Sequence, residues 1–294
     1  MLFPKYTPVL NNIRKRRPKT EPSKHARKAF VRRSSHARFS FSFLVLIVTL
    51  FFLFIPLFVI IFYSFNENKG SEFTNFSLCW YKDLFFSSGD LWEAVANSLI
   101  IAFCAGIAST ILGTLAAVGV RWHKFKGKEY IQLVSFLPMV LPEVIIGVST
   151  LIFFAGIKVP LGMGTIFAAH TTFCLPFVFL MVLARLDEFD YSIVEAAHDL
   201  GATEQQALLK VVLPAIMPGV VSGFLMAVTM SLEDFVITFF VSGPGSTTLP
   251  LYVYSMIRFG VSPVINALSL IIIISTIIVA FTMRKFLKTI AASK

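Results

Sequence analysis

The chain has 294 residues, and 56% of them are hydrophobic, including 32 phenylalanines, whereas only 14% are charged. This composition is too apolar for a water-soluble domain and indicates a polytopic membrane protein. The net charge of +10 does not describe the apolar body, because residues 1–39 contain 12 of the 26 Lys and Arg residues and one of the 16 acidic residues.

The N-terminal segment, residues 1–39, is basic and contains few aliphatic side chains. It cannot form a core, so we expect a disordered cytoplasmic tail. A nucleic-acid-binding arm is one interpretation of such a tail. Contact with anionic membrane lipid is favoured because an apolar span follows at once, and we expect no nucleic-acid partner. That apolar run is too long for a cleaved signal peptide and no small-residue cleavage site follows it.

Six apolar stretches follow, each long enough for the ~20 residues that a bilayer requires. They lie at 41–63, 91–120, 130–157, 165–186, 212–241 and 264–286, and together they predict an all-α membrane domain over residues 40–290. Pro138 and Pro142 interrupt the third span. Trp80 and Tyr81, in the polar segment after the first span, suit the membrane interface. The second span contains small residues for close helix contact, namely Gly106, Ala108, Ser109, Gly113, Ala116, Ala117 and Gly119.

The distribution of basic residues predicts the orientation of the chain. With both termini in the cytoplasm, 22 of the 26 Lys and Arg residues lie inside and only four lie outside, namely Lys69, Lys82, Lys158 and Arg258. Cysteine is sparse, since the chain contains only Cys79, Cys104 and Cys174. These are too scattered for a disulfide framework or a metal site. We expect the two within spans to be buried as small apolar residues.

Ionisable residues are rare within the spans, where a centrally placed acid costs ~2.5–3.5 kcal/mol and therefore usually faces protein or water. Glu143, Glu233 and Asp234 are our candidates for a substrate path, and they favour a cationic substrate. Because Glu233 and Asp234 are adjacent, on one helix they would point about 100° apart, so that at most one faces a central path. Alternatively, Glu143 caps a helix that restarts at Pro142, and the other two serve packing or gating. We interpret His170 as a hydrogen-bonded core residue.

The longest polar interruption in the second half of the chain is residues 195–214. It predicts two short amphipathic helices joined at Gly201, which can adopt the left-handed conformation of a sharp helix end. Thr203 with Gln206, and Ser192 with Glu195, have the spacing of capping boxes. Pro214 is expected to open the next apolar helix, at a position that needs no backbone donor.

This segment resembles the EAA loop of ABC importer permeases, in which E-A-A is followed by three residues, Gly, nine residues, an aliphatic residue, any residue and Leu-Pro. The residues that match are Glu195, Ala196, Ala197, Gly201, Leu213 and Pro214, while Val211 stands where Ile is usual. The resemblance implies a MetI-like permease fold in which the loop, at about residues 187–213, couples to a cytoplasmic ATPase. An alternative is that Glu195 only caps its own helix.

Residues 231–245 and 136–143, with later short motifs such as Leu249-Pro250-Leu251, are similar to the C-type permease of spermidine/putrescine importers. Asp is common in that family at the positions of Glu143 and Glu233, and both replacements keep the charge. The resemblance covers roughly residues 40–290 and excludes the basic tail. It implies a permease subunit for polyamine uptake in a bacterial inner membrane.

The same resemblance implies the other subunits of the importer. These are a second permease (PotB-like), a dimer of a cytoplasmic ABC ATPase (PotA-like) and an extracytoplasmic solute-binding protein (PotD-like). The chain contains no G-x-x-x-x-G-K-[ST] loop, so ATP and Mg are expected on the partner ATPase and no cofactor on this chain.

Three other classes of protein are alternatives to this interpretation. An ABC permease for another small solute shares much of the same scaffold. A stand-alone secondary transporter would use the three acids as a cation relay, but it has no need of a docking loop. A membrane enzyme would need a cluster of reactive side chains, and the five His residues are scattered along the chain.

Overall fold

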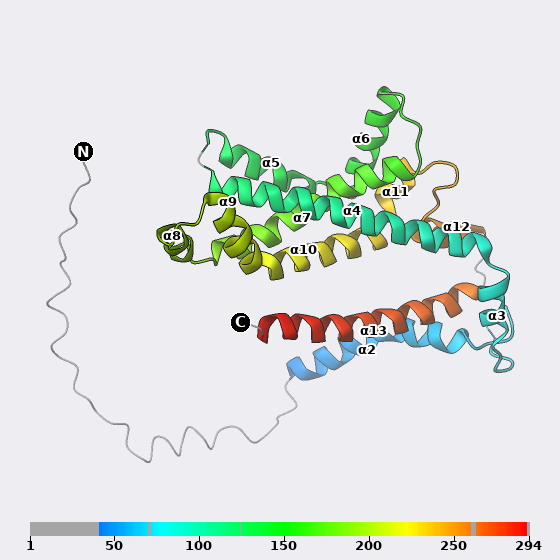
Figure 1. Ribbon diagram of the computed structural model, residues 1–294. Helices are drawn as coiled ribbons and strands as arrows, with labels where there is room; N and C mark the ends of the chain where they lie inside the picture. Colours follow the sequence, from blue (N-terminus) through cyan, green and yellow to red (C-terminus); the bar gives the residue numbers. More distant parts are fainter. Residues whose placement is uncertain (1–40, 70–71, 124, 260–262, 293–294) are drawn as a thin grey trace, which may run out of the picture. The chain divides into compact units, whose positions relative to one another are not determined.

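The computed structural model describes residues 41–69, 72–123, 125–259 and 263–292, so the predicted tail at 1–39 lies outside the described residues. The described chain is helical, with one isolated antiparallel bridge between Asn66 and Phe76. Its elements are α2 (Phe41–Tyr63), α3 (Cys79–Phe86), α4 (Gly89–Trp122), α5 (Lys128–Val140), α6 (Glu143–Gly156), α7 (Met163–Asp187), α8 (Ser192–Asp199), α9 (Glu204–Ala207), the π-helix η1 (Leu208–Val212), α10 (Leu213–Glu233), α11 (Val236–Val241), α12 (Leu249–Phe259) and α13 (Val264–Ala292) (Figure 1). The expected all-α fold is confirmed.

The chain divides after Phe58 into two compact units. The described part of the first unit belongs to α2, a continuous apolar helix with no buried residue. The second unit, residues 59–294, contains every other helix and all the sites discussed below.

Five of the described helices are long and apolar enough to cross a membrane, and the bent pair α5–α6 makes six if it is one span. The third predicted span is not a straight helix, because α5 and α6 meet at an angle of 107°. The break lies at Leu141, whose backbone is extended (φ −76°, ψ 137°), as the residue before a proline prefers. Pro142 therefore ends the helix, whereas Pro138 lies inside α5.

Helices α4, α7 and α10 pack against one another and form the centre of the second unit (Figure 1). Their contacts depend on the predicted small residues: a Cβ atom at Gly113 would lie 2.9 Å from Val178 of α7, and one at Gly106 would lie 2.6 Å from Val228 of α10. Ser109 and Ala117 are also buried. The expectation for cysteine holds for Cys174, which is buried, but is wrong for Cys104, which lies on an uncovered face of α4.

Helix α3 lies in the polar segment after the first predicted span, and α12 lies between the fifth and sixth predicted spans. A second apolar cluster joins Trp80 and Leu84 of α3 to Leu91 of α4 and to Ala267 and Leu268 of α13. The indole N–H of Trp80 donates to the carbonyl oxygen of Asn66 at 2.6 Å. Trp80 is therefore a buried residue whose polar atom is satisfied within the protein.

Candidate functional site

The predicted coupling loop consists of α8, a turn at Gly201, α9 and η1. Gly201 has φ +86°, as expected. Its N–H donates to the carbonyl of His198 at 2.8 Å, and the next N–H, from Ala202, donates to Ala197 at 3.0 Å. These bonds satisfy carbonyls at the end of α8 and turn the chain sharply. The expected pair of short helices joined at Gly201 is confirmed.

One of the two predicted capping boxes is present. The N–H of Thr203 donates to Gln206 Oε1 at 3.1 Å, and the N–H of Gln206 donates to Thr203 Oγ1 at 3.3 Å. The box predicted for Ser192 and Glu195 is wrong, because Ser192 is already the first residue of α8. Its N–H donates to the carboxylate of Asp190 at 3.0 Å instead, and this hydrogen bond to the charged form lowers the pKa of Asp190.

The expectation for Pro214 holds only in part. Pro214 lies in the first turn of α10, where no N–H is needed. However, α10 does not start from a free end, because the chain enters it directly from α9 through η1. The wider turn of η1 is closed by the N–H of Leu213, which donates to the carbonyl of Leu208. Such π-turns inside helices are frequent at functional sites.

The coupling loop presents one face and buries the other. Val194, Ala207 and Val212 belong to the core of the second unit. Glu195, Ala196 and Pro214 are exposed, and Ala197 and Leu213 are half-buried. Leu200, beside Gly201, is 90% exposed, although it is a large apolar side chain. The described chain therefore offers a partly apolar surface at the predicted position of ATPase contact.

The start of this loop contacts the end of α4. Arg121 lies 3.5 Å from the carboxylate of Asp187, and its guanidinium lies 5.5 Å from the centroid of the Tyr191 ring. Trp122 also contacts Tyr191, at a centroid distance of 6.4 Å. A displacement of α8 would therefore reach α4 through side chains as well as through the backbone.

The three candidate carboxylates lie together. Glu143, at the start of α6, Glu233, at the end of α10, and Asp234 line one cavity of about 310 Å³. The remaining lining residues are mostly apolar: Phe173, Met230, Phe235 and Val236. Within the described part of the chain, neither Glu143 nor Glu233 has a hydrogen-bond or ion-pair partner. Two carboxylates are thus left to face the cavity, which we call the inner cavity.

The prediction that Glu233 and Asp234 share one helix is wrong. Helix α10 ends at Glu233, and Asp234 is extended (φ −66°, ψ 123°). The Asp234 carboxylate is buried and accepts the N–H of Ile237 at 3.2 Å and that of Thr238 at 2.9 Å, which caps α11. The Thr238 hydroxyl donates to it at 2.8 Å. The helix breaks here because this side chain replaces the backbone partners that a continuous helix would supply.

His170 of α7 completes this arrangement. Its ring is 1% exposed, its Nε2 lies 3.1 Å from Asp234 Oδ2, and its Nδ1 lies 2.7 Å from the hydroxyl of Ser231. The expectation that His170 is a hydrogen-bonded core residue is confirmed. Sequence reasoning missed Ser231 and Thr238, although Thr238, four residues after Asp234, has a spacing at which a hydroxyl can meet a carboxylate. With His170 and Asp234 they form what we call the buried network.

Comparison with known proteins agrees with these features. Residues 109–290 match the family described as "Binding-protein-dependent transport system inner membrane component". The chain belongs to this family. The permease is 44% identical over 234 residues to the putrescine transport system permease protein PotI of Escherichia coli (strain K12), covering 77% of this chain and 83% of PotI. It is 39% identical over 220 residues to the spermidine/putrescine transport system permease protein PotC of Haemophilus influenzae, covering 74% and 85%.

Solved structures confirm the fold of the permease. A bacterial ABC transporter involved in the import of the acidic polysaccharide alginate has a chain that superposes with a TM-score of 0.69 at 16% identity, covering 90% of the permease and 99% of that chain. The family match and the identity to PotI and PotC show that the protein is a multi-pass permease subunit of an ABC importer of the inner membrane, a transporter component rather than an enzyme.

Proposed function

We propose that this permease imports polyamines, with the inner cavity as the place where the cation crosses. The observation that carries the proposal is the pair of unpartnered carboxylates, Glu143 and Glu233, on the wall of one largely apolar cavity. The names of the relatives that cover most of the chain, PotI and PotC, support putrescine or spermidine.

A polyamine carries the positive charges that the side chains lining the inner cavity do not supply. Its ammonium groups would neutralise the carboxylates of Glu143 and Glu233, and its methylene chain would lie against Phe173, Met230 and Phe235. Unpaired acids inside a membrane protein are expensive and usually mark a pathway for ions or substrates. Asp234 lines the same cavity, but its carboxylate already accepts several hydrogen bonds, so we assign it chiefly to holding the wall in place.

For energy coupling, we infer that the exposed face of the loop docks on a cytoplasmic ABC ATPase. Glu195, Ala196, Ala197 and Gly201 would make the contact, and Leu213 with Pro214 would pass the motion into α10. ATP and Mg would bind to that ATPase (PotA-like). A second permease (PotB-like) and a solute-binding protein (PotD-like) would complete the importer.

This arrangement requires the orientation that the basic residues favour, with both termini and the coupling loop in the cytoplasm. Helix α4 would then begin outside the cell and end inside, next to the loop. The start of α6 and the end of α10, which frame the inner cavity, would lie deeper in the protein. Alternating access would move α10 relative to α5 and α6 about the breaks at Pro142 and Asp234.

The test is uptake of radiolabelled putrescine by proteoliposomes that contain the whole importer. Glu143→Gln and Glu233→Gln keep the shape of the side chain and remove its charge, and we expect each to lower the uptake rate at least about tenfold, the effect of losing ~1.4 kcal/mol. Glu129→Gln, at an exposed carboxylate of α5, is the matched control. Absence of putrescine and spermidine uptake by the unaltered importer would overturn the substrate class, and normal rates in both variants would remove the inner cavity from the path.

A further inference from the structure

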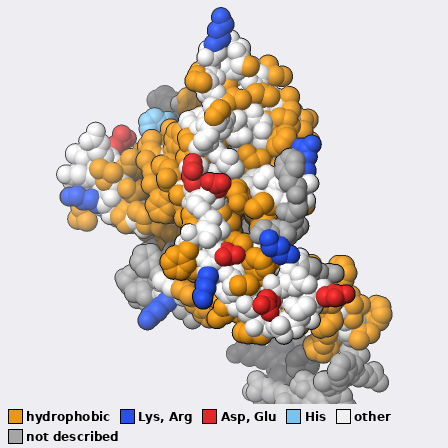
Figure 2. Space-filling view, turned by 90° about the vertical axis from the view of Figure 1, so that its right-hand side faces the viewer, with side chains coloured by type: hydrophobic (Ala, Val, Ile, Leu, Met, Phe, Trp, Pro, Cys, Tyr) orange, Lys and Arg blue, Asp and Glu red, His pale blue; other side chains and the backbone are white. Residues whose placement is uncertain are grey.

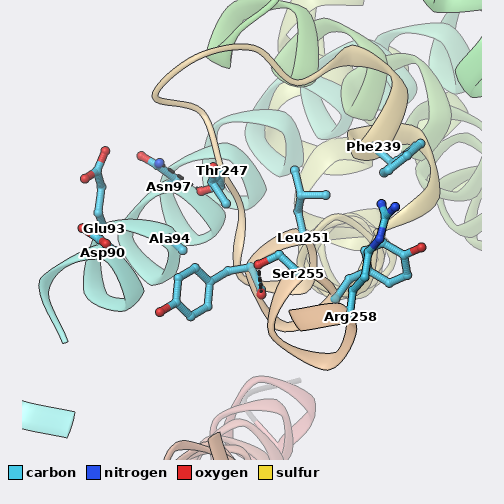
Figure 3. A pocket seen from close by; sticks show the side chains of 11 residues that line it. Asp90, Glu93, Ala94, Asn97, Phe239, Thr247, Leu251, Ser255 and Arg258 are labelled. Carbon is cyan, nitrogen blue, oxygen red and sulfur yellow. Dashed lines mark hydrogen bonds between the residues drawn. The ribbon is translucent and has the colours of Figure 1, made fainter. Parts of the chain in front are cut away.

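A second and larger cavity, of about 470 Å³, is lined mainly by residues of α4 and α12. Its walls come from the first turns of α4, the segment before α12, α12 itself and Phe239 of α11 (Figure 3). The residues that line it are Asp90, Glu93, Ala94, Asn97, Phe239, Thr247, Leu251, Tyr252, Tyr254, Ser255 and Arg258. We call it the outer cavity, and none of its lining residues belongs to the inner cavity.

The α4 wall of the outer cavity is polar and acidic. Asp90, Glu93 and Asn97 follow one another at spacings of three and four residues, so they share one face of the helix. Figure 3 shows these three side chains along the same helix, opposite Leu251 and Ser255 of α12. The face seen in Figure 2 carries acidic side chains together with Lys and Arg side chains, between hydrophobic areas.

The walls of the outer cavity are fixed to one another. The side-chain amide of Asn97 donates to the carbonyl of Thr247 at 3.1 Å. The N–H of Leu249 donates to the hydroxyl of Ser98 at 2.7 Å. These bonds hold the segment before α12 on α4. The two walls of the outer cavity are therefore joined by hydrogen bonds.

Aromatic rings form much of the remaining wall. Tyr252 and Tyr254 come from α12, and Phe239 comes from α11. Burial, and secondly the negative charge of Asp90, raise the pKa of Tyr252. Aromatic faces attract cations, typically by ~0.5–1 kcal/mol at exposed sites and more where water is excluded.

Aromatic rings that line the two cavities contact one another. Phe235 lines the inner cavity, and its ring centroid lies 4.6 Å from that of Tyr254 and 5.7 Å from that of Phe239, both of which line the outer cavity. Phe235 directly follows Asp234, so the buried network also sets the position of this ring.

Charge makes the outer cavity asymmetric. Arg258 stands near Phe239, away from Asp90 and Glu93 (Figure 3). A cation would therefore bind toward α4, with its apolar part lying along Tyr252 and Leu251. A ligand with a single negative charge would be repelled from the same wall.

We propose that the outer cavity is a second cation-binding site, in which Asp90 and Glu93 hold one ammonium group of an alkyl diamine and the tyrosine rings cover its methylene chain. The site would receive the polyamine before the rings of Phe235, Phe239 and Tyr254 part and admit it to the inner cavity. This inference rests on the proposed function, since it takes the same substrate class.

The test measures binding directly, through protection of a cysteine. In the complex of the two permeases with the ATPase, without the binding protein, Cys79 and Cys104 are replaced by Ser and Ala, and Ser255→Cys is introduced as the reporter in the outer cavity. The rate at which a cationic thiol reagent modifies the reporter is measured with and without putrescine, and 1,4-butanediol serves as the uncharged control. We expect putrescine at about ten times its dissociation constant to slow the reaction about tenfold, because only the free site reacts.

A matched set of variants separates this site from the inner one. Asp90→Asn combined with Glu93→Gln should remove the protection, whereas Glu143→Gln combined with Glu233→Gln should retain it. Glu67→Gln with Asp83→Asn, at exposed carboxylates outside the cavity, should also retain it. If the importer takes up putrescine but the reporter is never protected, or is protected equally in the Asp90/Glu93 variant, the outer site is disproved while the proposed function stands. If the unaltered importer takes up no polyamine, the proposed function fails.

Discussion

The chain leaves its helical path at Gly201 and at Asp234, and different kinds of hydrogen bond stabilise the two breaks. At Gly201 the chain turns on the surface, and every bond that holds the turn comes from residues at most five positions away. At Asp234 the chain breaks in the interior, and His170, 64 residues earlier, supplies part of what holds it. The first break is stabilised by local backbone chemistry, and the second by contacts between α7, α10 and α11.

This difference fits the proposed functions of the two regions, which are ATPase coupling at the loop and substrate passage at the inner cavity. A locally stabilised turn leaves its outer face free for a partner and can move as one piece with α8 and α9. A break tied to two other helices keeps Glu233 and Phe235 at fixed places on the wall of a cavity. Substitutions at the first break should therefore affect transport more than stability, and substitutions at the second should affect both.

The largest effect is expected from Glu195→Lys, on the exposed face of α8. It should abolish uptake and leave the amount of protein in the membrane unchanged, because the side chain has no role in the core. The measurement is putrescine uptake by the whole importer, together with pull-down of the ATPase. Glu129→Lys, outside the loop, is the control and should transport normally. Normal uptake by a well-expressed Glu195→Lys permease would contradict the coupling role.

Asp234→Ala should lower both the stability of the importer and its uptake rate. The change leaves the N–H groups of Ile237 and Thr238 unsatisfied in the interior, at a cost of about 1–3 kcal/mol. Thermal unfolding of the detergent-solubilised importer measures this, with Glu233→Ala as the neighbouring control, since it should reduce uptake with little change in melting temperature. Equal melting temperatures for the unaltered protein and Asp234→Ala would show that the buried network does not hold the break.

Gly201→Ala should have a smaller effect, confined to the loop. A Cβ atom at φ +86° costs about 1–2 kcal/mol, but it meets no neighbouring atom within 4 Å. We expect faster amide hydrogen exchange in α8 and α9, with the same exchange in α7 and α10, and a partial loss of uptake. An equal change in the rate of amide hydrogen exchange in α7 would mean that the turn is coupled to the interior, and that the turn at Gly201 is not held by local bonds alone.

The smallest effect is expected from Thr203→Ala, which removes one half of the capping box. Loss of such a cap costs about 1 kcal/mol and should fray α9 without changing the melting temperature of the importer. Gln206→Ala removes the reciprocal half and should behave alike. If either variant lowers the melting temperature as much as Asp234→Ala does, the loop is not the locally stabilised region described here.

The features that could be predicted from sequence share a local cause. The spans follow from hydropathy over ~20 residues, and the bend at Pro142 was indicated by a proline, although not its size. The box at Thr203 was correct, whereas the box at Ser192 was wrong because its spacing does not decide where a helix begins. The three carboxylates were found because charge is rare in membrane spans.

The sequence by itself determined the apolar spans, the turn at Gly201 and the permease family, since each depends on residues close together in the chain. Only the tertiary structure decided that the Asp234 carboxylate is hydrogen-bonded while that of Glu233 is not, that Trp80 is buried, and that rings lining the two cavities contact one another. The physical reason is that a hydrogen bond within a turn is encoded by spacing, whereas the partner of a buried side chain depends on which helices pack together. His170 and Asp234 meet because α7 lies against α10 and α11, and no spacing along the chain expresses that contact.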